Sequence, residues 1–72
     1  MLSIGQQFTV NDRGYDKLVF TVKRIAKPDS DNPQFDATAV DLEGIPNQVS
    51  YCFPQCGLLV YAERGELTIM PV

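Results

Sequence analysis

Alternation of apolar and polar side chains is the dominant pattern along this chain. Leu18, Phe20 and Val22 occupy one parity of residues 17–25, and mostly polar side chains occupy the other. A repeat of two positions is the side-chain repeat of a β-strand with one buried face. The pattern returns several times without a helical repeat, so the sequence predicts an all-β fold.

Turn-forming residues divide the alternating segments into five or six short strands. The strands are expected at about residues 3–10, 17–27, 35–42, 48–53, 58–62 and 66–70. Ile25 breaks the parity of Leu18, Phe20 and Val22, which indicates either a β-bulge near residues 23–24 or a strand that bends there. Short strands at this spacing predict one domain over residues 1–72, a small five- to six-stranded antiparallel barrel or sandwich.

The last third of the chain contains two predicted connections. Pro54 cannot donate to a strand ladder and Gly57 tolerates a left-handed conformation, so residues 53–57 predict a short 3₁₀ turn. Residues 63–65, Glu-Arg-Gly, then predict the tight turn of a hairpin between 58–62 and 66–70. A long first loop, a meander and this interruption resemble the layout of SH3-like small barrels. That resemblance is architectural and implies no activity, and the chain has no tryptophan.

Apolar residues on the inward parities form the expected core. They are Leu18, Phe20, Val22, Phe35, Val49, Tyr51, Val60 and Ile69. Phe8 and Phe53 are also expected inside. A chain of 72 residues buries only roughly 60% of its unfolded surface, so it needs very good packing or a partner.

Charge is unevenly distributed along the chain, whose net charge is −3. Residues 13–27 hold five of the six basic side chains, whereas residues 28–49 hold five acidic side chains and no base. Neighbouring strands that neutralise each other explain this pattern most simply. The alternative is a basic surface for nucleic acid, formed by Arg13, Lys17, Lys23 and Arg24, although net acidity does not favour it.

Few residues are candidates for chemistry. The chain has no histidine, which removes histidine-based acid–base catalysis and histidine metal ligands. Cys52 and Cys56 are separated by three residues, and we expect reduced, mostly buried thiols; a disulfide between them and a Cys₄ zinc site in a dimer are the alternatives. The aspartates of residues 29–31 lack the remaining ligands of a calcium loop. We therefore expect no enzyme activity, no cofactor and no metal.

The expected function is recognition of another protein through a sheet face or an edge strand. Leu67, Ile69 and Met70 are the candidate contact residues, because the terminal segment has apolar side chains on both faces and one face needs a cover. A homodimer is one such cover. The first residues lack a secretory signal and no stretch is long enough to span a bilayer, so we expect a cytoplasmic protein without membrane contact.

Overall fold

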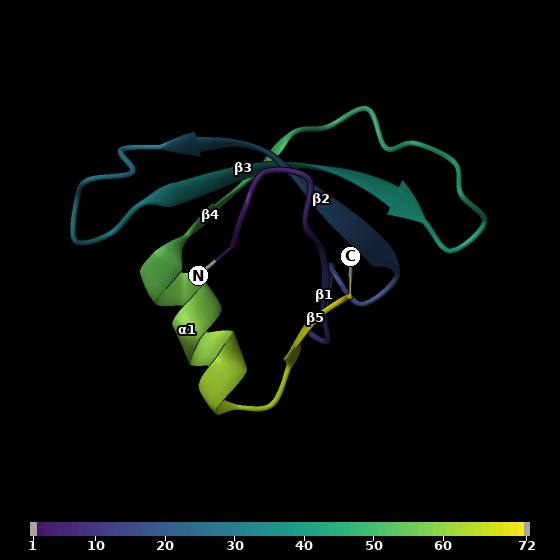
Figure 1. The fold of residues 1–72 in the computed structure, drawn as a ribbon. Helices are drawn as coiled ribbons and strands as arrows, with labels where there is room; N and C mark the ends of the chain where they lie inside the picture. The colour runs from purple at the N-terminus through teal and green to yellow at the C-terminus, as the bar shows by residue number, and fades with distance from the viewer. Residues whose placement is uncertain (1, 72) are drawn as a thin grey trace.

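The structure is a computed structural model that describes residues 2–71. Its elements are β1 (Gln7–Val10), β2 (Leu18–Ala26), β3 (Gln34–Asp41), β4 (Tyr51–Pro54), α1 (Gln55–Glu63) and β5 (Leu67–Ile69). The five strands form one antiparallel sheet in the order β4-β3-β2-β1-β5. The sheet curls into a half-barrel, and α1 lies against both β4 and β5 at its open side (Figure 1). The predicted small antiparallel all-β fold is confirmed.

The long hairpin of β2 and β3 is the centre of the sheet. Its register runs from Leu18 opposite Asp41 to Ala26 opposite Gln34. The register shifts between Val22 and Arg24, so the predicted β-bulge is confirmed. The bulge returns Ile25 to the inner face, where it packs against the core.

Aromatic rings fill the half-barrel. All four phenylalanines are buried, as predicted, and Phe20 is at the centre of the cluster. Its ring centroid lies 5.3 Å from that of Phe8, 5.0 Å from that of Phe53 and 5.2 Å from that of Tyr51. Because most of these contacts are edge-to-face, they add to the free energy gained from burial alone.

The predicted core is only partly correct. Phe20, Val22 and Phe35 are buried, and Leu18 and Tyr51 pack against the core while half-buried. Three core predictions were wrong. Val49 is 58% exposed, Val60 is 45% exposed and Ile69 is 41% exposed. Val49 precedes β4, Val60 is on the outer side of a helix, and Ile69 lies on the outermost strand.

The predicted 3₁₀ turn and hairpin were also wrong, because residues 55–63 form α1. Pro54 is at the N-cap position, with its φ of −69° and ψ of 147°, and starts the helix directly after β4. At the other end, Gly65 N–H donates to Ala62 O and Glu66 N–H donates to Tyr61 O. With Gly65 at a φ of 72°, these two bonds form a Schellman motif. Residues 63–65 thus end a helix rather than turn a hairpin.

Candidate interaction surfaces

The connection between β3 and β4, residues 42–50, carries three of the most exposed aliphatic side chains in the described residues. We call this segment the β3–β4 loop. Leu42 is 73% exposed, and Ile45 and Val49 are each 58% exposed. The loop projects from the far end of the sheet, on the opposite side of the view from α1 (Figure 1). Three solvent-exposed aliphatic side chains thus lie within eight consecutive residues of the chain.

Hydrogen bonds from Asp41 hold the first half of the β3–β4 loop in place. Its Oδ1 accepts from the backbone N–H groups of Glu43 and Ile45, both at 2.9 Å. Its backbone N–H donates to Ile45 O at 3.0 Å, and its carbonyl accepts from Gly44 N–H at 3.0 Å. Gly44 has a φ of 84°, a left-handed value that glycine adopts without strain. Leu42 and Ile45 therefore project from an ordered turn.

Asn47 anchors the second half of the β3–β4 loop. Its backbone N–H donates to Ala39 O at 2.8 Å, and its side-chain amide donates to Tyr51 Oη at 2.8 Å. Pro46 forms an isolated bridge with Val40. These contacts attach the loop to both flanking strands.

A shallow hollow lies beside this loop. It has a volume of about 220 Å³ and is lined by Lys17, Asp41, Leu42 and Glu43. Ligand pockets usually measure about 300–1,000 Å³ and are mostly apolar. The hollow is therefore smaller and more charged at its rim than a typical small-molecule site.

The open edge of β5 is a second exposed feature. Asn11 N–H donates to Glu66 O at 2.7 Å, and Met70 N–H donates to Gln7 O at 2.9 Å, so residues 66 and 70 direct these groups toward β1. Since successive residues of an antiparallel strand alternate in direction, Leu67 and Ile69 direct their backbone N–H and C=O groups away from β1. Because β5 ends the sheet, these groups form its open edge.

The three predicted contact residues of the C-terminal segment differ in how far their side chains are exposed. Leu67 is half-buried against the core, and Met70 is half-buried after β5 ends. Ile69 is 41% exposed. Of the three side chains, Ile69 is thus the one most available to a partner.

The four predicted nucleic-acid contacts are divided between two places. Arg13 and Lys17 lie in or at the end of the β1–β2 connection, whereas Lys23 and Arg24 lie at the bulge of β2. Lys17 and Arg24 are separated by roughly 20 Å of strand. Arg24 Nη1 lies 3.7 Å from Asp36 Oδ2 on β3, so the predicted neutralisation between neighbouring strands is confirmed for this pair.

The cysteines do not match the prediction of burial. Cys52 on β4 and Cys56 on α1 are both exposed, free thiols. The Cys52 Sγ donates to Gln34 Oε1 at 3.4 Å. Partial burial, followed by the neighbouring Asp36 carboxylate, raises the pKa of this thiol. Since the thiolate is the nucleophile, the raised pKa makes Cys52 less reactive. Cys56 lies on the outer side of α1 with exposed Leu59 and Val60.

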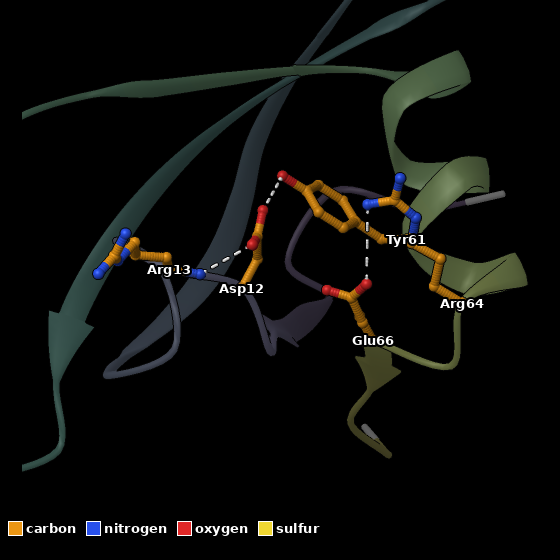
Figure 2. A network of polar contacts seen from close by, with 5 residues as sticks. All are labelled: Asp12, Arg13, Tyr61, Arg64 and Glu66. Atoms are coloured by element: carbon orange, nitrogen blue, oxygen red, sulfur yellow. Dashed lines mark hydrogen bonds and ion pairs between the residues drawn. The ribbon is translucent and has the colours of Figure 1, made fainter.

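A polar network fastens α1 to the β1–β2 connection (Figure 2). Tyr61 Oη donates to Asp12 Oδ2 at 2.9 Å, and Asp12 Oδ1 accepts from Arg13 N–H at 2.8 Å. Arg64 Nη1 lies 3.9 Å from Glu66 Oε1 across the end of the helix. The hydrogen bond to Asp12, followed by partial burial, raises the pKa of Tyr61. These contacts position elements of the fold rather than a substrate.

Within residues 2–71, no cluster of three or more histidine, cysteine or acidic side chains is arranged to hold a metal ion. The helix found in this part of the chain is too short to cross a bilayer.

Comparison with protein-family models, curated proteins and solved structures finds no match to this chain. The functional argument therefore rests on its own residues.

Sequence reasoning missed the β3–β4 loop as a surface. Alternation predicts Val49 in the core, because it shares the parity of Tyr51 and Phe53. The signal that identifies the loop is Ile45 within Glu43-Gly44-Ile45-Pro46-Asn47. An isoleucine inside such a turn cannot follow a strand into the core, because the turn itself runs at the surface.

Proposed function

We propose that this protein is a non-enzymatic protein-interaction module that binds its partner through the β3–β4 loop. The observation that carries the proposal is the exposure of Leu42 and Ile45 on a turn fixed by Asp41. Single exposed aliphatic residues are common on protein surfaces. Here two of them, with Val49 following, project from one hydrogen-bonded loop.

The order of the loop favours binding. Association loses free energy when flexible loops and side chains become fixed at the interface. The turn around Asp41 is already fixed by four hydrogen bonds, so docking orders little additional backbone. The free energy from burying Leu42 and Ile45 is then available for affinity.

Charge defines the chemistry of the partner. Asp41 and Glu43 flank Leu42, and residues 28–49 contain five acidic side chains and no base. Lys17 also lines the hollow beside them, so the two carboxylates outnumber this cation there. Complementary charges at the rim of an interface speed association and exclude wrong partners. The partner is therefore a protein with an apolar pocket bordered by lysine or arginine.

Four features support protein binding rather than catalysis or nucleic-acid recognition. The chain has no histidine, and Cys52 is a weak nucleophile because its pKa is raised. Arg13 and Lys17 lie at the β1–β2 connection, away from Lys23 and Arg24 at the bulge of β2. Arg24 also lies beside Asp36. Nucleic-acid binding depends on several cations that neutralise phosphates together.

Affinity capture from the native cell, followed by binding measurements with the captured protein, tests the proposal. The test variant carries Leu42→Ser and Ile45→Ser, and the matched control carries Ile4→Ser and Leu59→Ser, which are also exposed positions. Loss of two buried aliphatic contacts, each worth about 1.5–3 kcal/mol, weakens binding at least about tenfold in the test variant. The control binds like the parent protein.

Two results contradict the proposal. One is equal affinity of the test variant and the parent protein for the captured partner. The other is a capture that disappears with nuclease, weakens steeply with salt and is lost when Lys17, Lys23 and Arg24 are replaced by alanine. The second result establishes nucleic-acid binding instead.

A further inference from the structure

We propose that the open edge of β5 binds a second copy of this chain, with the two β5 strands antiparallel around a two-fold axis. This surface is separate from the β3–β4 loop, so the two proposals can fail independently. The starting observation is the set of outward backbone groups on Leu67 and Ile69. Two N–H and two C=O groups at a sheet edge form a template for another strand.

The three residues of β5 are self-complementary in antiparallel register. A two-fold axis through Thr68 places Leu67 of one copy opposite Ile69 of the other. Both residues direct their backbone groups outward, so each pair exchanges two hydrogen bonds. Leu67 and Ile69 then contact each other on one face, and the two Thr68 side chains meet on the other, which is a favourable cross-strand pair.

Charge favours a second copy at this edge over most other surfaces of the protein. The net charge of −3 means that like charges repel when two copies approach at random. Residues 67–71, Leu-Thr-Ile-Met-Pro, carry no charge. Among the described residues, the carboxylate nearest to this segment in sequence is that of Glu66, which lies 3.9 Å from the guanidinium of Arg64. Two copies can therefore meet at β5 without bringing unpaired carboxylates together.

The two edges of the sheet differ in protection. Edge strands are usually guarded by proline, lysine or a bulge. β4 includes Pro54, which has no N–H to offer, and it leads directly into α1. β5 has no proline, lysine or bulge within its three residues, and Pro71 follows only after the strand has ended. α1 lies against β5 as well as β4, so the difference between the two edges is that no proline or bulge in β5 blocks strand pairing.

The dimer is expected to be weak. Stable interfaces bury about 1,200–2,000 Å², which exceeds what two strands of three residues can bury. We therefore expect a dissociation constant on the order of 10–100 µM. Sheet order puts β5 and β4 at opposite ends, so pairing at β5 leaves the β3–β4 loop of each copy free. The dimer then presents two partner sites.

Sedimentation equilibrium of the full chain over a range from micromolar to high micromolar concentration tests the proposal. The average mass rises from 8.0 kDa toward twice that value as concentration increases. Ile69→Lys introduces a charge at the edge and weakens dimerisation at least about tenfold. The control Ile45→Lys, at another exposed isoleucine, dimerises like the parent chain. Circular dichroism checks that both variants are folded.

A chemically synthesised chain with an N-methyl group on Ile69 separates strand pairing from side-chain contact. The methyl group removes one outward donor, keeps the isoleucine side chain and leaves the bonds to β1 intact. This chain is expected to dimerise at least about tenfold more weakly. The proposal is overturned if the parent chain stays at 8.0 kDa throughout, if Ile45→Lys rather than Ile69→Lys abolishes the dimer, or if the N-methylated chain dimerises normally.

Discussion

Tyr61 connects three parts of the molecule through one side chain. Its ring packs against the core, its hydroxyl donates to Asp12, and its carbonyl accepts from Glu66 in the Schellman motif. The hydrogen bond to the Asp12 carboxylate stabilises the protonated hydroxyl, which raises the pKa of Tyr61 above its ordinary value of 10.0. Ionisation of Tyr61 at alkaline pH therefore destabilises the folded protein.

Tyr61→Phe is expected to lower the free energy of unfolding by about 1 kcal/mol at neutral pH, because it removes a partly exposed hydrogen bond. The folded-state pKa is raised, so this contribution is fully present below the ordinary pKa of 10.0 and is lost as pH rises through the folded-state pKa. The difference between parent and variant should therefore shrink in alkaline solution. Urea unfolding followed by circular dichroism, at neutral pH and above pH 10, measures it. A difference that stays constant or grows contradicts the assignment.

Among the elements, α1 is the one that the sequence pattern predicts wrongly, as a turn followed by a strand. Leu58-Leu59-Val60-Tyr61-Ala62 is a continuous apolar run, and periodicity alone does not distinguish a buried helix from a strand in such a run. The residues that flank the run determine that it is a helix. Pro54 begins the helix and Gly65 ends it, whereas the sequence pattern predicts a strand break and a hairpin turn at these two residues.

Strands with clear alternation were predictable for a physical reason. In β2, one face is buried against rings and the other faces outward, so parity alone identifies Phe20 and Val22 as core and locates the bulge. The candidate surface was less predictable, because exposure of Leu42, Ile45 and Val49 depends on where β3 ends and β4 begins. Strand ends are set by tertiary contacts such as those of Asn47.

Two glycines of the helical region are expected to respond oppositely to substitution. Gly65→Ala places a side chain at a φ of 72° and should lower the free energy of unfolding by about 1–2 kcal/mol. Gly57→Ala is within α1, and its new Cβ would lie 3.5 Å from Pro54 Cγ, an ordinary contact. It should raise stability by about 0.5–1 kcal/mol, because alanine favours the helix. Chemical denaturation of both variants checks the signs; equal effects would contradict a helix ended by Gly65.

For the whole molecule, apolar packing outweighs charge. None of the fully buried side chains in residues 2–71 is polar. The ion pairs Arg24–Asp36 and Arg64–Glu66 are long, at 3.7 and 3.9 Å, and their arginines are mostly exposed. Exposed pairs of this kind contribute only about 0–1 kcal/mol and are screened by salt. The phenylalanine cluster is therefore the main source of stability.

Arg24→Ala is accordingly expected to change the free energy of unfolding by less than about 1 kcal/mol, and high salt should change it little. Phe20→Ala removes the central ring and should cost about 3–5 kcal/mol. A loss of that size approaches the whole stability of a small domain, so the variant should be largely unfolded. Thermal and urea denaturation at low and high salt measure the stability of the two variants and of the parent protein. A larger effect from Arg24→Ala than from Phe20→Ala would contradict this balance.

The pairing of β1 with β5 also determines how the molecule responds to mechanical force. The two strands are antiparallel, and Met70 N–H is bonded to Gln7 O at the end of the pair where β1 begins and β5 ends. Tension applied beyond the C-terminal end of β5 therefore loads this bond first and then the bonds behind it in succession. Residues 2–6 are held more firmly, since Leu2 is buried and Gly5 N–H donates to Val22 O. Under load, β5 peels away first while the β2–β3 hairpin keeps its register.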